Sequence, residues 1–304
     1  MRIDACPACD SRDLRPVGKE SHSLAWHVGG EDFTQPAYQL LRCRVCDLYF
    51  KSQVMDQATL ARYYQRVDFG KWSESEWSPI EELCSRWLAE VPPGGAILDY
   101  GCSTGRLLAP FAATRRCYGV EVNVVAAEQA SRCGIRMVEE STLTSLEPLD
   151  AVVLSDVYEH LLHPANTAVR LLELLRPGGL LMLASGDAGA WPFRVQKGDF
   201  WYFQTPEHVS MVTRRHLRYL ARRGGAELLE CHQTSHYRFG ARSRARQAAE
   251  LVLYALMNGQ FSRAARPILR LVPGVRRALR WRQAPVVTGF HDHLVATLRR
   301  ATGP

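Results

Sequence analysis

The feature that most constrains the fold is the run 97–105, in which an apolar stretch ends on an acidic residue and passes into a glycine turn. Asp99 closes the apolar part, and Gly101 and Gly105 flank Ser103 in the turn. An apolar run followed by such a turn is typical of a buried strand that leads into a ligand-binding loop. The run therefore predicts the first strand and loop of a nucleotide-binding α/β domain.

The glycine spacing narrows the kind of nucleotide. A dinucleotide loop usually needs three glycines to bring backbone N–H groups against a pyrophosphate, whereas this loop has two. Asp99 would repel a diphosphate but favours a nearby ammonium or sulfonium. The loop, with a helix expected over 106–113, therefore predicts S-adenosylmethionine (SAM), whose adenosine carries a cationic amino-acid tail.

A second acidic residue follows this loop at a spacing typical of nucleotide-binding folds. The run 117–122 predicts the next strand, and Glu121 near its end lies twenty residues after Gly101. A carboxylate there can accept hydrogen bonds from both ribose hydroxyls. Strands expected over 150–155 and 180–184, with a helix between them, continue the alternation of an α/β fold.

Four motifs stand in the order and spacing of a known family: ILDYGCSTG, YGVEVN, LSDVYEHL and LRPGGLLMLAS. Over about residues 80–237, plus a last strand near the C-terminus, the chain resembles the class I SAM-dependent methyltransferases. The resemblance implies a Rossmann-like sheet that is mostly parallel, with the last strand, 292–300, antiparallel at the sheet edge. Ser103 departs from the family pattern, which usually has glycine there.

The resemblance also implies which residues bind the donor. Glu140 and Ser141, after the third strand, are expected against the adenine, and Asp156 or Tyr158 beside the methionine part. The predicted donor-binding set joins these to the loop and the ribose carboxylate: Asp99, Gly101, Ser103, Gly105, Glu121, Glu140, Ser141, Asp156 and Tyr158.

Methyl transfer to a hydroxyl, or to a carbon beside a carbonyl, needs a general base. The leading candidates are His208 and Glu207, in the segment WYFQTPEHVSMVT, because an imidazole titrates near neutral pH. An EH after an aromatic loop resembles the site of antibiotic deoxysugar C-methyltransferases, which implies His208 as the base with Glu207 beside it. Those enzymes have a further large C-terminal domain, from which this chain departs. His160 is the second candidate base, and a structural role for His208 stays open.

The N-terminal segment contains two C-x-x-C pairs, Cys6 with Cys9 and Cys43 with Cys46. Each pair offers two thiolates from one tight turn, and two pairs complete a tetrahedral structural zinc site. The sequence therefore predicts a zinc ribbon, with unliganded thiols as the alternative. The resembling sugar methyltransferases also carry an N-terminal zinc-binding segment.

The expected domain organisation follows from these signals and from the breaker Pro92-Pro93-Gly94-Gly95. The resemblance to the methyltransferases also implies that Tyr63 or Tyr64, in the aromatic helical connector, faces substrate. The predicted units are a zinc ribbon at 1–50, a helical connector at 51–93, a SAM-binding core at 94–237, a helical insertion at 238–290 and a closing strand at 291–304.

The net charge of +7 is unevenly distributed. Residues 1–209 carry 20 Lys and Arg against 27 Asp and Glu, whereas residues 210–304 carry 18 against 4, so the two parts have net charges of −7 and +14. A basic helical region suits nucleic acid, an anionic membrane surface or a phosphorylated acceptor, although it is also typical of a solvated helix face. The sequence has neither a signal-peptide pattern nor an apolar run long enough to span a membrane, so we expect a cytoplasmic protein, with peripheral membrane contact as an option.

Three functions are compatible with these patterns. The first is a SAM-dependent methyltransferase that acts on a small molecule, such as a sugar, a natural product or a glycan intermediate linked to a nucleotide or lipid. In that case Arg276 and Arg277 are expected to contact the acceptor. The second is an RNA methyltransferase that uses the arginine-rich region, and the third is a donor-binding module without activity.

Overall fold

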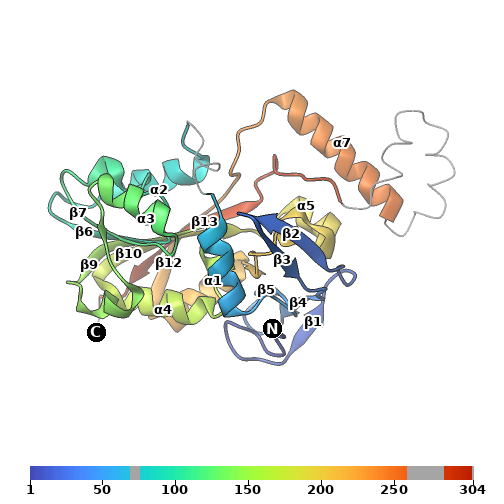
Figure 1. The fold of residues 1–304 in the computed structure, drawn as a ribbon, viewed down its shortest axis with the longest axis horizontal. Helices are drawn as coiled ribbons and strands as arrows, with labels where there is room; N and C mark the ends of the chain where they lie inside the picture. The colour runs from blue at the N-terminus through green and yellow to red at the C-terminus, as the bar shows by residue number, and fades with distance from the viewer. Residues whose placement is uncertain (69–75, 259–283, 303–304) are drawn as a thin grey trace.

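The computed structural model describes residues 1–68, 76–258 and 284–302. Within them, seven strands form one sheet (Figure 1). Their spatial order is β12 (Ala226–Thr234), β13 (His293–Arg300), β10 (Leu175–Gly186), β9 (Leu149–Ser155), β6 (Ala96–Tyr100), β7 (Arg116–Val120) and β8 (Arg136–Met137). The pairs from β10 to β8 are parallel, and β13 is antiparallel to both of its neighbours. The predicted mostly parallel sheet is confirmed.

Helices cover both faces of this sheet (Figure 1). On one face, α2 (Pro79–Ala89) and α3 (Val124–Arg132) pack apolar residues against alternate residues of β6 and β9. On the other face, α4 (Pro164–Leu174) and α6 (Arg214–Arg223) cover the intervening residues. The central strands are buried on both sides, as is usual for parallel strands between helix layers.

The N-terminal unit is joined to the core by backbone pairing. Its smaller sheet combines β1 (Leu14–Pro16), β4 (Leu40–Cys43) and β5 (Tyr49–Lys51) with β11 (Ser210–Met211), which comes from the region after the core strands. A hairpin of β2 (Leu24–Val28) and β3 (Glu31–Gln35) contacts α1 (Gln57–Arg66). The predicted boundary after residue 50 therefore falls within β5.

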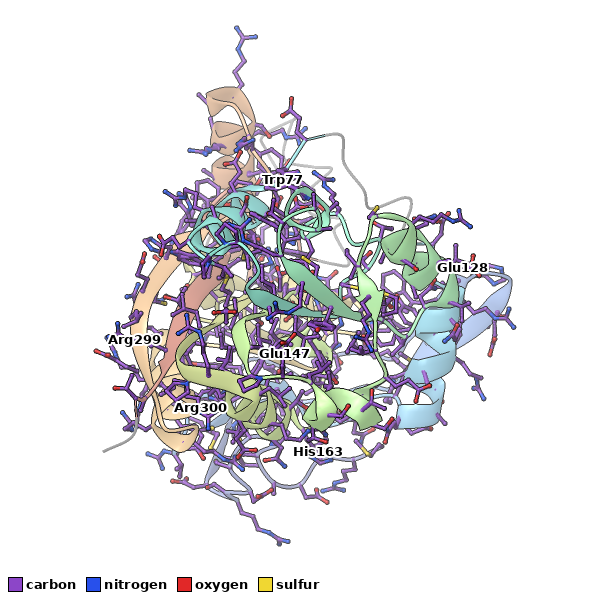
Figure 2. All side chains as sticks on the ribbon, turned by 90° about the vertical axis from the view of Figure 1, so that its left-hand side faces the viewer. Trp77, Glu128, Glu147, His163, Arg299 and Arg300 are labelled. Carbon is purple, nitrogen blue, oxygen red and sulfur yellow. The ribbon has the colours of Figure 1, made fainter. Side chains whose placement is uncertain are left out.

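The position of the last strand differs from the expectation. The predicted edge strand 292–300 is β13, and it lies between β10 and β12, so β12 forms the edge. β13 pairs along its length with β10 on one side and β12 on the other, and six successive residues of β13 are buried, whereas most of β12 is exposed or half-buried. Arg299 at the end of β13 forms an ion pair with Glu227 of β12 at 2.8 Å. Figure 2 shows Arg299 and Arg300 beside the ribbons of these two strands.

The helix expected over 106–113 is absent from the described fold. This segment consists of turns and one short 3₁₀ helix, Ala109–Phe111. Pro110 lies in its middle, and a proline removes a backbone donor that an α-helix needs. Leu107 and Leu108 are nevertheless buried, so the segment contributes to the core without being α-helical.

The C-terminal part of the described chain begins with the helix α6 (Arg214–Arg223). Thr213 caps α6 by accepting the His216 N–H, and Gly224 ends the helix. Beyond β12, the helix α7 (Ala241–Asn258) lies past α5 (Trp191–Gln196), away from the central sheet (Figure 1). The rest of the predicted helical insertion, including Arg276 and Arg277, lies outside the described residues. None of the described helices has both the length and the hydropathy of a membrane span.

The turn after β6 depends on a glycine. Gly101 has a φ of +85°, in the region that disfavours residues with a Cβ. A Cβ at this position would lie 2.4 Å from Cγ2 of Val157, which follows β9. Both the backbone conformation and the packing against the next strand's loop therefore require glycine here.

We predict that Gly101→Ala destabilises the protein by roughly 2–4 kcal/mol, because the positive φ and the clash with Val157 both cost free energy. Gly240→Ala is the control, since a Cβ there has no atom within 4 Å, and it should change the stability by less than about 0.5 kcal/mol. Urea unfolding of both variants measures the difference. Equal stabilities would contradict this account of the turn.

Candidate active site

The predicted donor-binding loop is held together by one carboxylate. Glu121, after β7, accepts the Ser103 N–H through Oε2 at 2.9 Å and the Asn123 N–H through Oε1 at 2.8 Å. Each carboxylate oxygen has a second lone pair, so Glu121 can still accept two hydroxyl donors. Ser103 adopts a φ of +48° in this loop, so the residue that departs from the family pattern still forms the turn.

Asp99 lies beneath the same loop and is 5% exposed. Burial and, after it, the negative charge of Glu121 raise the pKa of Asp99 to about 7. A buried carboxyl with such a pKa gains from a neighbouring positive charge, because the cation stabilises its ionised form. This position therefore suits the cationic ligand that the sequence predicted.

The residues after β9 point in two directions. Asp156 has a φ of +53°, and its Oδ2 lies 3.0 Å from Nε2 of His236. Tyr158 is fully buried, and its hydroxyl donates to Nε2 of His216 at 2.7 Å. The prediction that Asp156 or Tyr158 lines the donor pocket is therefore corrected for Tyr158, whose hydroxyl is used inside the core.

The two residues predicted against the adenine lie at the start of the 3₁₀ helix Glu140–Ser145, which follows β8. Both are exposed. Glu140 pairs with Arg170 at 3.2 Å, and the Ser141 hydroxyl donates to Glu139 at 3.2 Å. Their contact with an adenine ring stays a prediction.

His208 has a defined protonation pattern. Its Nδ1 lies 2.7 Å from the carbonyl oxygen of Tyr202, and because a carbonyl only accepts, Nδ1 carries the proton. Nε2 therefore keeps a lone pair. The ring stacks on the Tyr202 ring at 3.9 Å between centroids, which fixes its orientation. Burial and, after it, the neighbouring His160 lower the pKa of His208 well below its ordinary value, so the ring stays neutral.

Glu207 is buried and precedes His208 in the chain, but its hydrogen bond is to a residue other than His208. It accepts a hydrogen bond from the Tyr63 hydroxyl of α1 at 3.0 Å. The buried ammonium of Lys51 donates to the Thr205 carbonyl at 2.7 Å. Burial, partly offset by the charge of Glu207, lowers the pKa of Lys51 to about 7. Glu207 thus links the connector helix to the loop that carries His208.

Other ionisable side chains surround His208. The ring of His160 lies 4.9 Å away, and the ring of Tyr64 contacts His160 edge-on at 5.8 Å. Ligand-capable atoms of Glu159, His160 and His208 all lie within 4.8 Å of one another. The Tyr64 hydroxyl is buried without a hydrogen-bond partner, so of the two connector tyrosines it is the one free to meet a ligand.

Sequence reasoning missed part of this site. His236 follows β12 and His293 begins β13, and both come within reach of Asp156. His236 follows the carboxyl end of a strand, a position where α/β sheets bind ligands. That signal could have identified His236, whereas the sequence around His293 has no comparable spacing.

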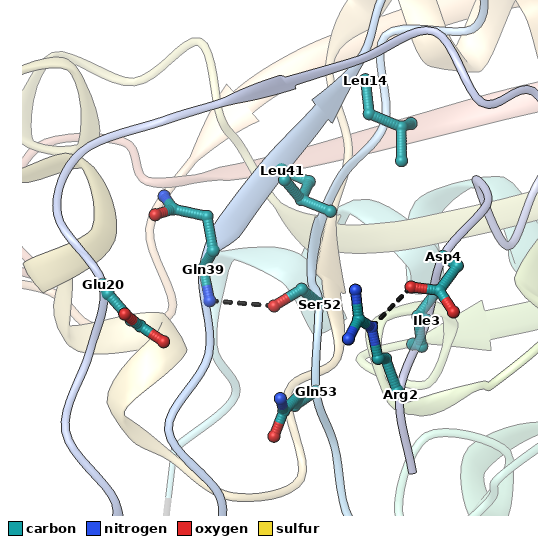
Figure 3. Close-up of a pocket in the computed structure, with 9 residues that line it drawn as sticks. All are labelled: Arg2, Ile3, Asp4, Leu14, Glu20, Gln39, Leu41, Ser52 and Gln53. Carbon is teal, nitrogen blue, oxygen red and sulfur yellow. Dashed lines mark hydrogen bonds and ion pairs between the residues drawn. The ribbon is translucent and has the colours of Figure 1, made fainter.

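A pocket of about 370 Å³ lies elsewhere, in the N-terminal unit (Figure 3). Its polar side chains are partly engaged, because Arg2 pairs with Asp4 at 2.6 Å and the Ser52 hydroxyl accepts the Gln39 N–H at 2.9 Å. None of the predicted site residues lines it. The carboxyl ends of β6, β7 and β9 stay the predicted place of the chemistry.

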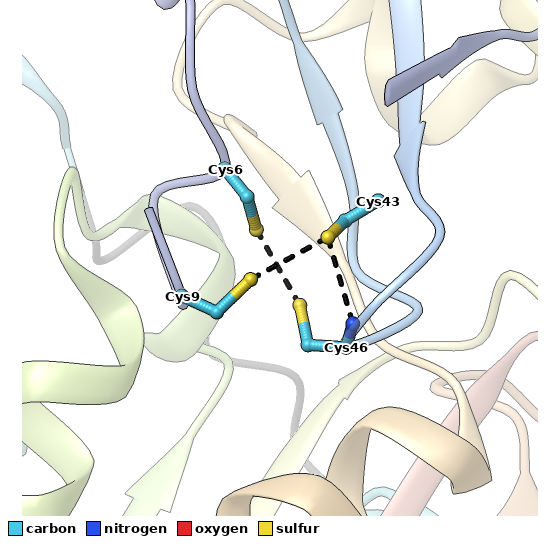
Figure 4. A group of neighbouring side chains, drawn as sticks. All are labelled: Cys6, Cys9, Cys43 and Cys46. Carbon is cyan, nitrogen blue, oxygen red and sulfur yellow. Dashed lines mark hydrogen bonds between the residues drawn. The ribbon is translucent and has the colours of Figure 1, made fainter. Parts of the chain in front are cut away.

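The four cysteines of the N-terminal unit converge (Figure 4). The Sγ atoms of Cys6 and Cys46 are 3.4 Å apart, those of Cys9 and Cys43 are 3.5 Å apart, and all four lie within 4.8 Å of one another. The backbone of this cluster is hydrogen-bonded to the core: His216 of α6 donates from Nδ1 to the Cys46 carbonyl at 3.0 Å.

A methyltransferase domain family matches residues 52–231, more than half of the chain. The chain belongs to this family. The match spans the glycine loop, Glu121, Asp156 and His208, and it confirms the enzyme class predicted from the sequence, a SAM-dependent methyltransferase. No curated protein matches the chain in sequence.

One solved structure supports the fold, and two others are similar to the chain at lower TM-scores. The magnesium protoporphyrin IX methyltransferase of Synechocystis PCC 6803, with bound S-adenosylhomocysteine, is 14% identical, with a TM-score of 0.52 over 81% of this chain and 100% of that chain. A Haloferax volcanii complex of the Trm112 activator with a methyltransferase is 12% identical, with a TM-score of 0.49 over 74% and 90%. The 1,6-didemethyltoxoflavin-N1-methyltransferase of Burkholderia thailandensis is 15% identical, with a TM-score of 0.43 over 74% and 79%.

We predict that SAM binds more tightly as the pH rises toward and through about 7. Asp99 is partly protonated in the free enzyme below this pH, and the cationic ligand favours its ionised form, so binding releases a proton. Well below pH 7 the dissociation constant should rise by up to about tenfold per pH unit. Calorimetric titrations across this range measure it. Asp99→Asn should bind more weakly and without this dependence, and a pH-independent affinity of the unmodified enzyme would contradict the assignment.

Proposed function

We propose that the enzyme transfers the methyl group of SAM to a hydroxyl, or to a carbon beside a carbonyl, of a small polar molecule such as a sugar or glycan intermediate. His208 is the general base. The observation that carries this proposal is the Nδ1 hydrogen bond of His208 to the Tyr202 carbonyl, which leaves Nε2 unprotonated in a cluster of polar groups.

The loop residues fit the donor. Glu121 keeps two acceptor positions for the ribose hydroxyls, and Asp99 is placed to favour the cationic end. Gly101 and Gly105 have positive φ, and a Cβ on either would clash with a neighbouring side chain. Bound SAM supplies a sulfonium methyl group that is already activated for displacement, so alignment and proton removal are left to the protein.

The groups near His208 favour a hydroxyl-rich acceptor. Asp156, Glu159 and His160 all follow β9, and each has a buried polar side-chain atom without a hydrogen-bond partner. Glu159 is buried and accepts from the Tyr202 hydroxyl through Oε1, whereas its Oε2 has no hydrogen-bond partner. Such partnerless polar atoms suit hydroxyl groups better than an apolar surface. Asp156 was predicted beside the methionine part of SAM. We assign it to the acceptor side instead, because its carboxylate pairs with His236.

The experiment is transfer of labelled methyl from SAM into a fractionated host extract. Label is expected in a small-molecule or lipid-linked fraction, and His208→Ala should lower the rate by about 10²–10⁴-fold, the usual contribution of a general base. His163→Ala is the control, because His163 is exposed at the surface (Figure 2). Label in RNA would overturn the proposal in favour of the RNA methyltransferase, and an unchanged His208→Ala rate would exclude His208 as the base.

We further propose that the four cysteines hold a structural zinc ion. Tetrahedral thiolates at about 2.3 Å from zinc lie about 3.8 Å from one another, close to the observed sulfur separations. Cys46 also accepts from His216, which in turn accepts from Tyr158, so the zinc site would fix the segment after β9.

We predict that Cys46→Ser loses zinc, measured by metal analysis, and lowers the melting temperature by several degrees, because a closed zinc site contributes folding free energy. Cys133→Ser is the matched control, since Cys133 is exposed and lies outside the cluster. Full stability of the Cys46→Ser variant without zinc would contradict a structural role.

A further inference from the structure

Three side chains from separate elements meet beside the proposed acceptor site. Asp156 follows β9, His236 follows β12, and His293 begins β13. One ligand-capable atom of each lies within 4.8 Å of the others. The group is separate from the cysteine cluster of the N-terminal unit, and its two imidazoles and one carboxylate form a different kind of donor set.

The Asp156 carboxylate is incompletely satisfied. Its Oδ2 lies 3.0 Å from Nε2 of His236, but its Oδ1 is buried without a hydrogen-bond partner. A buried carboxylate oxygen without a donor is costly, and native proteins rarely leave one so. A cation between Oδ1 and the nearby imidazoles would remove this cost.

His293 is oriented for such a cation. It is 2% exposed, and its Nδ1 lies 2.8 Å from Oδ1 of Asp292, which is 1% exposed. In the neutral ring, an N–H at Nδ1 that donates to Asp292 leaves Nε2 with a lone pair, and Nε2 lies 4.0 Å from Oδ1 of Asp156. Two lone-pair atoms would then face each other. A buried carboxylate that orients a histidine in this way is the usual support of a metal-binding imidazole.

We propose that Asp156, His236 and His293 bind a divalent transition-metal ion. Ligand atoms at about 2.0–2.2 Å from one ion lie at most about 4.4 Å apart. The distance from His236 to Oδ2 of Asp156, 3.0 Å, and that from His293 to Oδ1, 4.0 Å, fall within this limit. Two imidazoles and one carboxylate suit zinc, iron, cobalt or nickel, and three protein ligands leave coordination positions open.

The open positions lie near the proposed base. The ring of His293 is 5.6 Å from that of Tyr202, on which His208 stacks. An ion held here can bind an acceptor oxygen and favour its deprotonation. This role rests on the proposed function, whereas binding of the ion itself does not.

The test is equilibrium dialysis of the zinc-loaded, full-length protein against Co²⁺, with bound metal counted. We expect one Co²⁺ per chain in addition to zinc. His236→Gln removes one ligand at a position that is 36% exposed, so the core stays intact, and it should weaken Co²⁺ binding at least tenfold. Asp156→Asn should do the same. His232→Gln is the matched control, because His232 forms a surface pair with Glu230 at 2.7 Å and should leave binding unchanged.

Three results would overturn the proposal: absence of Co²⁺ binding, binding that survives both Asp156→Asn and His236→Gln, or binding that is lost instead in His160→Gln, from the neighbouring group around His208. Circular dichroism of each variant confirms that the fold is retained. Co²⁺ binding without methyl transfer would support the metal site and count against the proposed function alone.

Discussion

The hydrogen bond from the Ser103 amide to the Glu121 carboxylate is the contact on which the proposed donor site depends. It joins the loops after two adjacent parallel strands, β6 and β7, whose register brings their carboxyl ends to the same level. Parallel strands bring their loops together at one edge of the sheet, and there a shared ligand is the common outcome. Asp156 after β9 and His236 after β12 lie at the same edge, so the strand order brings together the proposed donor side and the proposed acceptor side.

A second set of contacts ties the N-terminal unit to this edge. Glu207 accepts from Tyr63 of α1, and His216 bridges the Cys46 carbonyl to the Tyr158 hydroxyl. Each contact is between buried groups, and loss of one partner would leave the other unsatisfied at a cost of about 1–3 kcal/mol. The N-terminal unit therefore supports the loops that carry His208 and Asp156, which gives a physical reason for its fusion to a methyltransferase core.

The sequence predicted what local chemistry determines. The glycine turn and the acid after the second strand depend on a few neighbouring residues, and the structure contains both. The sequence could not predict contacts between segments that lie far apart in the chain. His293 is adjacent to Asp156 only because β13 inserts beside β10, and the expected edge position of that strand was wrong for the same reason. Tyr158 was misassigned because the direction of its side chain depends on His216, far along the chain.

The central claim is that the carboxyl edge of β6 and β7 binds the adenosine part of SAM through Glu121. Calorimetric titration with S-adenosylhomocysteine tests it without requiring an acceptor. The unmodified enzyme should bind one molecule per chain, and Glu121→Ala should weaken binding on the order of 100-fold, the value of two hydrogen bonds to a charged group. Glu128→Ala, on the exposed face of α3 (Figure 2), should bind like the unmodified enzyme. Equal affinities for Glu121→Ala and the unmodified enzyme would contradict the account.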